Sequence, residues 1–462
     1  MSGARRALGR LAQLVALALV AACSEPAAPR PPNVVVILID TLRPDHLQPY
    51  GYKHATSPYL AELAARGVLF ERAYSASTWT APATASLFTG LYPNEHGVVE
   101  GFFVHRARKA GQPASKENGD VQGEAKERWD KNQDAVVSLN RLPDALPTAP
   151  ELFAAAGYAT FGFSSNVNIT SRIGFDRGFQ HFADFTGPEH GKGAQAEQAL
   201  EQVRAWKSEL SGEKPYFLYL HFNDVHAPWR ERARVYEPGA EDLAAERAAY
   251  DAELRHLDET LRRIDDELEW DDDTLVCVLS DHGEEFGEHG DLGHGYSLHA
   301  ELMRIALVFS WPAELPGGRK LDTPASIVDV LPTLAQLAGV PAPQQLGGVS
   351  LAPLLAGKAP PPERTLFALR FKDGGVRQLW AAQRGRWKLI LSGRGPQLYD
   401  HERDPFERTD VSAEHAEVLA SLMNDLRAFR ARTLASASEK FEVELDAEAL
   451  RALEALGYTD GK

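Results

Sequence analysis

The run Asn-Val-Val-Val-Ile-Leu-Ile-Asp at residues 33–40 decides the fold class of this 462-residue chain. Its β-branched and leucine residues show no polar alternation, which is typical of a strand buried on both faces of a parallel sheet. Further apolar runs follow at 215–222, 274–279 and 305–309, and helical patterns lie between them. Strands that alternate with helices predict an α/β fold with a large, mostly parallel sheet flanked by helices.

Polar side chains stand where these apolar runs end. Asp40 follows the first run, and Asp224 and His226 follow the second. Asp281 and His282 follow the third. The carboxyl ends of parallel strands meet at one edge of a sheet, so we expect these groups to converge on a divalent-metal site. A single aspartate after a strand is more often a turn residue or a helix cap, and the prediction therefore rests on the joint occurrence at three strand ends.

Residues 77–93 predict a short helix with a hydroxyl group at its start. Pro82 suits the first helical turn, and Gly90 suits the position after the last turn. Thr80 then lies at the N-terminus, where unpaired N–H groups and the helix dipole stabilise negative charge. This place suits a nucleophile that faces an anionic ester, although a capped surface helix is the simpler interpretation of the stretch alone.

The N-terminus has the pattern of an exported lipoprotein. Arginines at 5, 6 and 10 precede an apolar run that is too short to span a bilayer, and small residues lead directly to Cys23. We expect a lipidated Cys23 and a membrane-anchored protein that faces the periplasm or the cell exterior. An ordinary secretory signal with an incidental cysteine is the alternative, and both imply export.

Composition predicts how the chain is divided. Pro- and Ala-rich residues follow the signal, a polar stretch interrupts the apolar pattern, and a Pro-rich stretch at 358–363 suggests a boundary. The expected segments are a signal peptide over 1–23, a tether over 24–32, a catalytic domain over 33–360 with a polar insertion at 101–145, a C-terminal α+β subdomain over 361–435, and a C-terminal helix and tail over 436–462.

Charge and cysteine content exclude some classes of function. The formal net charge is −16 and no concentrated basic patch is evident, which argues against a nucleic-acid partner. Besides Cys23 the chain has only Cys277, which lies within an apolar run as a small buried residue would. We therefore expect no intramolecular disulfide.

In order and spacing, these motifs resemble the sulfatase family of the alkaline-phosphatase superfamily over about residues 33–457. The resemblance implies an ester hydrolase in which Asp40, Asp281 and His282 bind a metal ion. Thr80 matches the nucleophile, whose oxygen also contacts the metal in this family. The matching segments are residues 35–46, 80–93, 221–228, 279–284, 329–334, 398–400 and 404–405.

The resemblance also implies residues that contact the transferred group. His226 matches a histidine with that role. His294 lies near the place where the family often has a lysine, and the alternative interpretation is a solvated loop histidine beside two others. Arg43 is a candidate contact for the substrate anion.

The chain departs from the family pattern around the nucleophile. Sulfatases begin this motif with a Cys or Ser that is oxidised to formylglycine, whereas this chain has Thr80. The Ser-Arg pair after the proline is replaced by Ala83 and Thr84, and Thr41 replaces the second of two paired aspartates. A threonine nucleophile is typical of the phosphodiesterases, phosphonate hydrolases and phosphoethanolamine or glycerophosphate transferases of the wider superfamily.

We therefore expect a metal-dependent hydrolase or transferase that acts on phosphate or phosphonate esters through Thr80. One alternative is a sulfatase that works without formylglycine, and another is a catalytically silent, lipid-anchored binding protein. The expected cofactor is one divalent ion (Zn, Mn, Mg or Ca), with a second ion left open. The expected substrate is a small anionic ester on a sulfated or phosphorylated glycan, lipid or small molecule.

Overall fold

A large mixed sheet forms the centre of the computed structural model, which describes residues 30–100, 136–184, 196–227, 229, 243–372, 377–432 and 440–444. Its strands are β1 (Asn33–Ile39), β2 (Val68–Phe70), β5 (Ala159–Ser164), β6 (His181–Asp184), β7 (Tyr216–Phe222), β8 (Thr274–Ser280), β12 (Leu307–Ser310) and β13 (Arg319–Leu321). They lie in the order β13-β2-β12-β8-β1-β7-β5-β6.

Most neighbouring strands of this sheet run parallel, as the apolar runs predict. The strands β8, β1, β7, β5 and β6 form a continuous parallel block. The exception is β12, which pairs antiparallel with both β2 and β8. The apolar run at 305–309 therefore contains a buried strand, but one of the opposite direction to its neighbours.

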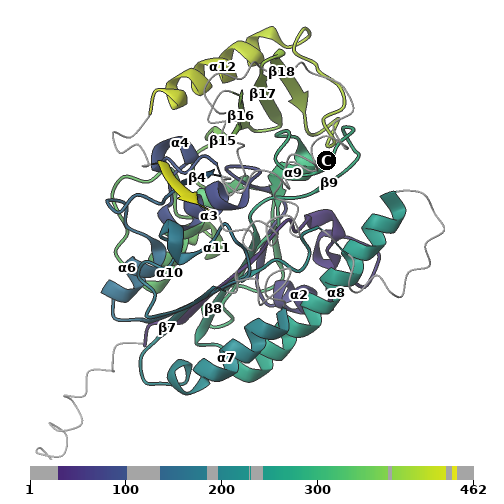
Figure 1. The fold of residues 1–462 in the computed structure, drawn as a ribbon. Coiled ribbons are helices and arrows are strands. Elements are labelled where there is room, and N and C mark those ends of the chain that lie inside the picture. The colour runs from purple at the N-terminus through teal and green to yellow at the C-terminus, as the bar shows by residue number, and fades with distance from the viewer. Residues whose placement is uncertain are drawn as a thin grey trace, which may run out of the picture. The chain divides into compact units, whose positions relative to one another are not determined.

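Helices cover both faces of the sheet (Figure 1). One layer holds α2 (Pro58–Ala65), α7 (Ala196–Leu210) and α8 (Leu243–Leu268), and the other holds α3 (Thr80–Thr89), α6 (Ala149–Ala155) and α10 (Val330–Ala338). Successive side chains of a strand point to opposite faces, so β1 contributes to both apolar layers. Val34, Val36 and Leu38 pack in the layer with α3, and Val35, Ile37 and Ile39 pack in the layer with α8.

A four-stranded antiparallel sheet forms the C-terminal subdomain. Its strands are β15 (Leu366–Lys372), β16 (Arg377–Arg384), β17 (Trp387–Ser392) and β18 (Gly395–Asp400), and α12 (Ala416–Arg430) packs against it. The rings of Phe367 and Phe429 stack with centroids 4.0 Å apart, and Tyr92 meets Phe429 edge-on at 5.0 Å. The subdomain thus shares its apolar core with the segment that follows α3.

Shorter elements complete the description. Three small sheets are formed by β11, β3 and β14, by β10 and β9, and by β19 and β4. Their bounds are β3 (Ala73–Tyr74), β4 (Val136–Asn140), β9 (Glu285–Phe286), β10 (Leu292–Gly293), β11 (Arg304–Ile305), β14 (Ala325–Ser326) and β19 (Lys440–Glu444), and the remaining short helices are α4 (Pro93–His96), α9 (Ala300–Met303), α11 (Ala352–Leu355) and the 3-10 turns Pro44–His46, Gln48–Tyr50, Ser171–Ile173 and Ile327–Asp329.

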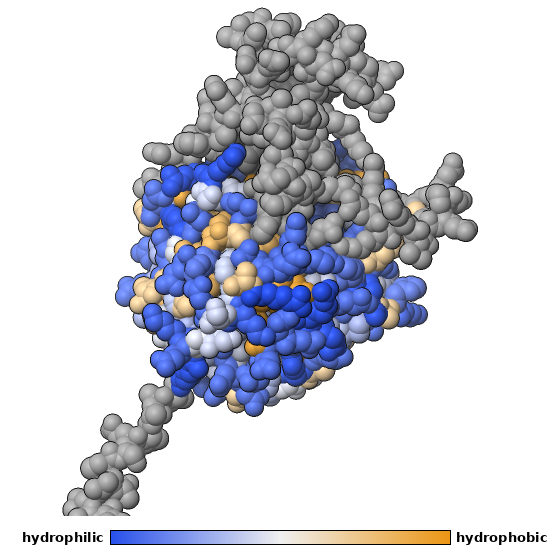
Figure 2. All heavy atoms as spheres, turned by 60° about the horizontal axis from the view of Figure 1, so that its bottom comes forward, coloured by the Kyte–Doolittle hydropathy of each residue, from blue (hydrophilic) through white to orange (hydrophobic). Residues whose placement is uncertain are grey.

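Several predicted segments lie outside the described residues. They are the signal peptide with Cys23, most of the tether, residues 101–135 of the polar insertion and the expected helix near the C-terminus. In the parts of the chain that are described, no helix has the length and apolar character needed to cross a membrane. The face where α7 and α8 lie is mostly hydrophilic, with scattered apolar residues (Figure 2).

Candidate active site

The ends of β1 and β8 bring Asp40, Asp281 and His282 together. The two strands are parallel neighbours, with Ile39 paired to Ser280, so the residues that follow them emerge side by side. All three site residues are fully buried, and their ligand atoms lie within 4.8 Å of one another. The convergence expected from the strand ends is therefore present for these three residues. Asp224 is not part of the cluster, and its Oδ1 accepts a hydrogen bond of 3.1 Å from the backbone N–H of Ala196.

Thr80 is the first residue of α3 and joins this group. Its Oγ1 lies 3.4 Å from Asp40 Oδ2 and 3.4 Å from His282 Nε2. The helix ends at Gly90, whose φ of 67° lies in the left-handed region. Every residue of α3 is buried, so the helix is not the capped surface helix that the stretch alone could suggest.

His282 presents a ring nitrogen in the form that a metal ligand needs. Its Nδ1 donates a hydrogen bond of 2.9 Å to the carbonyl oxygen of Gly283. This bond places the ring proton on Nδ1 and leaves the lone pair of Nε2 facing Asp40 Oδ1 at 3.7 Å and Asp281 Oδ2 at 3.4 Å. A carbonyl partner of this kind fixes both the tautomer and the ring orientation.

The donor set fits a divalent cation. Within the described residues, Asp40 Oδ1 and Asp281 Oδ2 are buried and have no hydrogen-bond partner. Burial and the nearby carboxylates of Asp281 and Glu284 raise the pKa of Asp40 well above its usual value. Such a buried negative cluster is costly without a compensating cation. Two carboxylates, an imidazole and a hydroxyl form a mixed oxygen and nitrogen site of the kind that binds divalent transition metals.

Asn166 holds Asp40 in place and was missed in the sequence analysis. Its Nδ2 donates to Asp40 Oδ2 at 2.5 Å and to Asn223 Oδ1 at 2.9 Å. Its Oδ1 accepts from the backbone N–H of Asn168 at 2.8 Å. Asn166 lies two residues after β5. Its position as a polar residue just past a strand end is the sequence signal that would have predicted it.

His226 and His294 lie beside His282. The His294 ring centroid is 4.6 Å from that of His282 and 5.0 Å from that of His226. His226 Nδ1 donates to the carbonyl oxygen of Ala227, and burial followed by the proximity of His294 lowers the pKa of His226 to about 4. Burial and the proximity of His282 hold the pKa of His294 well below its usual value. The structure thus brings these two predicted site residues together on one side of the metal cluster, next to His282.

Glu284 is a further buried group on this side of the metal cluster. Its Oε1 lies 3.1 Å from His294 Nδ1, and burial raises its pKa to about 7. The sequence placed Glu284 only within a matching motif, because a glutamate in a Gly- and His-rich loop carries no periodic signal of burial.

The guanidinium of Arg43 is already engaged by protein groups, whereas a residue that binds the substrate anion needs free N–H donors. Its guanidinium pairs with Asp45 at 2.7 Å and with Glu288 at 2.8 Å, and it donates to the carbonyl oxygen of Glu284 at 2.9 Å. These partners hold the residue in a structural ion-pair network. The geometry does not favour the predicted role of Arg43 as a contact for the substrate anion.

Thr41 does not replace the missing aspartate as a ligand. Its hydroxyl donates to the carbonyl oxygen of Val225 at 3.2 Å, and its backbone N–H donates to Asp281 Oδ1 at 3.2 Å. Its φ of 56° is in the left-handed region, which is uncommon for a β-branched residue and indicates local strain. Thr41 therefore positions Asp281 through its backbone.

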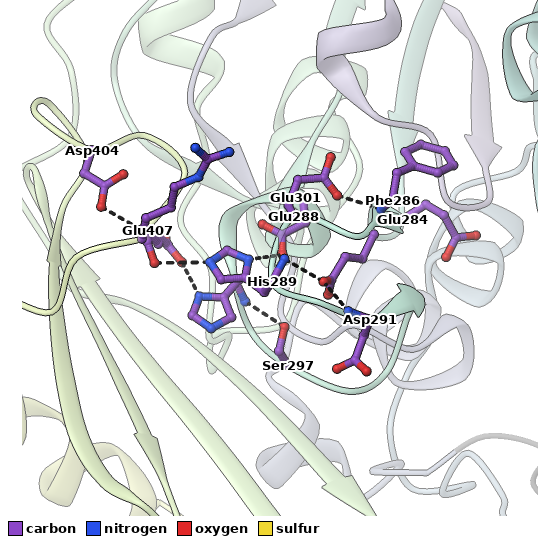
Figure 3. A network of polar contacts seen from close by, with 12 residues as sticks. Glu284, Phe286, Glu288, His289, Asp291, Ser297, Glu301, Asp404 and Glu407 are labelled. Atoms are coloured by element: carbon purple, nitrogen blue, oxygen red, sulfur yellow. Dashed lines mark hydrogen bonds and ion pairs between the residues drawn. The ribbon is translucent and has the colours of Figure 1, made fainter. Parts of the chain in front are cut away.

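A second cluster of Glu285, His289 and Glu301 has the geometry of an ion pair. His289 Nδ1 lies 2.7 Å from Glu301 Oε1, and His289 Nε2 lies 3.2 Å from the carbonyl oxygen of Glu407 (Figure 3). Two ligands of one ion are separated by about 3 Å or more, given metal–ligand distances of about 2.0–2.6 Å. Both nitrogens of His289 thus sit at hydrogen-bonding positions, and this cluster lends no support to a second metal ion.

Comparisons with known proteins agree with this description. The profile of the family described as "Sulfatase" matches residues 32–340, and that of "N-sulphoglucosamine sulphohydrolase, C-terminal" matches residues 287–432. Human arylsulfatase A is 26% identical over 467 residues, covering 88% of this chain and 84% of that protein.

Two solved structures show the same fold. A 2-O GAG sulfatase has a TM-score of 0.68 and 20% identity, and covers 87% of this chain and 93% of its own. The phosphonate monoester hydrolase of Agrobacterium radiobacter has a TM-score of 0.64 and 23% identity, and covers 90% of this chain and 99% of its own.

The fold and the buried cluster of carboxylates, histidines and one hydroxyl define a member of the alkaline-phosphatase superfamily. Within it, the chain belongs to the sulfatase family and is an ester hydrolase.

Proposed function

We propose that this sulfatase-family hydrolase cleaves phosphate or phosphonate esters, with Thr80 as the nucleophile. The observation that carries the proposal is the position of the Thr80 hydroxyl, 3.4 Å from both Asp40 Oδ2 and His282 Nε2 within a fully buried site. A divalent ion held by Asp40, Asp281 and His282 would lower the pKa of this hydroxyl and offset the charge of the ester.

The residues of the chain account for the rest of the reaction. The Thr80 hydroxyl loses its proton, Thr80 Oγ1 attacks phosphorus, the bond to the leaving alkoxide breaks and the alkoxide leaves as the alcohol with that proton, so that Thr80 carries the phosphoryl or phosphonyl group. Water then attacks the same phosphorus, releases the phosphate or phosphonate and returns the proton to Thr80. We assign to His226 and His294 the roles of hydrogen-bonding the ester and moving the leaving-group proton, and the support is that the His294 ring lies between those of His282 and His226 at centroid distances of 4.6 and 5.0 Å.

Threonine chemistry favours this reaction over the formylglycine route. Oxidation of a threonine side chain gives a ketone, because its β-carbon carries a methyl group and cannot become the aldehyde of formylglycine. Similarity to the phosphonate monoester hydrolase fold is compatible with phosphorus esters, and similarity to sulfatases keeps sulfate esters as the second candidate.

A substrate panel tests the proposal. The full-length protein is assayed with aryl phosphate monoesters, phosphate diesters, phosphonate monoesters and sulfates, with each divalent metal and after chelation, and in parallel with Thr80→Ala. We expect metal-dependent turnover of a phosphorus ester that is lost in Thr80→Ala. Turnover of sulfate alone, or an unchanged rate in Thr80→Ala, would contradict the proposal. Metal binding without any turnover would favour the binding-protein alternative.

We also propose that Cys23 is lipidated and that the protein is anchored to a membrane outside the cytoplasm. The support is the order of charged, apolar and small residues that leads to Cys23. Metabolic labelling with a fatty acid tests this: we expect label in the wild type and none in Cys23→Ser. Label that persists in Cys23→Ser would refute the anchor.

A further inference from the structure

Arg370 is a buried arginine that reaches the active site from the C-terminal subdomain. It lies on β15, is only 2% exposed, and is the largest of the fully buried side chains. It lies outside the metal cluster and outside the segments that follow the ends of β1, β7 and β8. A buried guanidinium is retained only where it makes specific contacts, because its burial is costly.

The contacts of Arg370 are with residues that flank two site residues. Its guanidinium carbon lies 4.0 Å from the ring centroid of Trp79, which directly precedes Thr80. Its Nε donates a hydrogen bond of 3.0 Å to the carbonyl oxygen of Gly295, which directly follows His294. The side chain of Arg370 therefore contacts two segments, of which one carries Thr80 and the other carries His294.

The two segments are packed so closely that the position of one limits the other. Gly295 has a φ of 78°, and a Cβ added there would lie 1.9 Å from Trp79 Nε1, so only glycine fits against the indole. Thr78 Oγ1 donates to the carbonyl oxygen of Ser297 at 3.2 Å, which adds a second link between the segments.

The backbone of β15 is attached to the same segment. The N–H of Leu369 donates to the carbonyl oxygen of Ala76 at 3.0 Å, four residues before Thr80. Arg370 therefore extends from a strand that is itself hydrogen-bonded to the chain leading into α3. Arg370 is therefore fixed both through the backbone of its strand and through the contacts of its guanidinium.

We propose that Arg370 is a positioning residue, which fixes Trp79 and Gly295 and thereby sets the placement of Thr80 and His294 relative to each other. A planar guanidinium suits this task because it stacks on an aromatic ring while its edge donates hydrogen bonds. The C-terminal subdomain thus contributes to catalysis through a defined contact. The kinetic part of this inference rests on the proposed function of Thr80.

The test compares Arg370→Met and Arg370→Lys in the full-length protein, with Arg384→Met as the control. Arg384 lies on the same sheet but pairs with Asp425 and Ser421 on α12. We expect Arg370→Met to lower kcat about 100-fold while KM changes little, since small misplacements of reacting groups have effects of that size. Arg370→Lys keeps the charge but not the planar fork, and should recover part of kcat. Arg384→Met should leave kcat and KM unchanged.

Two further measurements separate positioning from a general loss of structure. Metal content and the unfolding midpoint of Arg370→Met should stay close to those of Arg370→Lys. The contribution of Trp79 to fluorescence, obtained by difference from Trp79→Phe, should become more accessible to acrylamide in Arg370→Met. This quenching needs no substrate and therefore tests the contact even if Thr80→Ala retains activity and the proposed function fails.

The proposal is overturned if Arg370→Met keeps kcat within about threefold of the wild type. It is also overturned if Arg384→Met loses as much activity, or if quenching of Trp79 is the same with and without the guanidinium. If Arg370→Met does not fold, the kcat of Arg370→Lys is the deciding measurement. A kcat equal to that of the wild type would show that the planar guanidinium does not position Thr80 and His294.

Discussion

Thr80 differs from an ordinary helix-capping threonine in what its hydroxyl faces. The oxygen does not cap the N–H groups of α3 but lies 3.4 Å from Asp40 Oδ2 and 3.4 Å from His282 Nε2. As the first residue of α3, Thr80 still lies at the positive end of the helix dipole. The residue thus stands between the groups that would hold a cation and a helix terminus that favours an anion.

Replacing Thr80 distinguishes a nucleophile from a structural hydroxyl. Thr80→Ala should lower turnover of the best ester by about 10⁴-fold or more, because the covalent step is lost. Thr80→Ser keeps the oxygen and should retain activity within about 100-fold. Steady-state kinetics measures the turnover of each variant, and mass spectrometry after rapid quenching detects phosphorylated Thr80. Equal activity of Thr80→Ala and Thr80→Ser would show that the hydroxyl is not the nucleophile.

Asn166 offers a test of the metal site that needs no substrate. Its amide donates to Asp40 Oδ2, and groups that orient metal ligands contribute about 10–100-fold to metal affinity. Asn166→Ala should weaken Mn²⁺ or Zn²⁺ binding by that factor in a calorimetric titration.

The control for this experiment is Asn94→Ala. The Asn94 amide contacts the carbonyl oxygen of Phe429, which lies in α12, and its removal should leave metal affinity unchanged. Equal affinities of Asn166→Ala and the wild type would mean that Asp40 is not oriented through this bond, or is not a ligand.

At the scale of elements, β1, β7, β8 and β12 could be predicted from the sequence because burial on both faces leaves an uninterrupted apolar run, whereas the short strands β2 and β13 and the edge strand β6 gave no such run. The direction of β12 was not readable, since an apolar run of four or five residues looks the same in a parallel and an antiparallel pair. Polar groups at strand ends gave Asp40, Asp281 and His282. Arg370 was missed because arginine side chains are mostly exposed, so a single arginine in the sequence of a strand gives no sign that it is buried.

The turn after β8 depends on the absence of a side chain at Gly283. A Cβ there would lie 1.9 Å from the carbonyl oxygen of Glu301, and the Gly283 carbonyl holds Nδ1 of His282. Gly283→Ala should destabilise the protein by about 2 kcal/mol or more and weaken metal binding, because the backbone that carries His282 must move.

The matched control is Gly393→Ala. No heavy atom lies within 4 Å of a Cβ built at Gly393, and its φ is not in the left-handed region. This variant should change the unfolding free energy by less than about 0.5 kcal/mol. Urea unfolding and a metal titration measure both variants. A Gly283→Ala protein with unchanged stability and affinity would show that the turn can relax.

At the scale of the molecule, Glu407 joins the C-terminal subdomain to the loop between β9 and α9. The backbone of Glu407 has a φ of 54°, in the left-handed region. The carboxylate is buried and contacts Lys388 at 2.7 Å and His299 at 3.1 Å as well as His401. These donors hold the pKa of Glu407 well below its usual value despite burial. The loop that carries His294 is therefore joined to the subdomain through the contact of His299 with Glu407 as well as through Arg370.

His289 makes part of this connection sensitive to pH. Its hydrogen bond to Glu301 outweighs the effect of burial and raises its pKa to about 9, and the other groups around it are Glu285, the stacked ring of His299 and the backbone carbonyl of Glu407. Above pH 6.5 the folded protein retains a proton that the unfolded chain releases, so its stability falls as pH rises. The contribution is fully present below about pH 6.5 and is lost as pH rises through about 9.

We therefore expect the unfolding free energy of the wild type to fall by about 1–3 kcal/mol more than that of His289→Gln between pH 6.5 and 9. Gln keeps a polar group of similar size but binds no proton in this range. The control His54→Gln removes an exposed histidine and should follow the wild type. Urea unfolding at half-unit pH intervals gives the two slopes. Parallel slopes for the wild type and His289→Gln would show that the pair with Glu301 does not hold the proton, and that the subdomain is joined to the loop by interactions that do not titrate in this range.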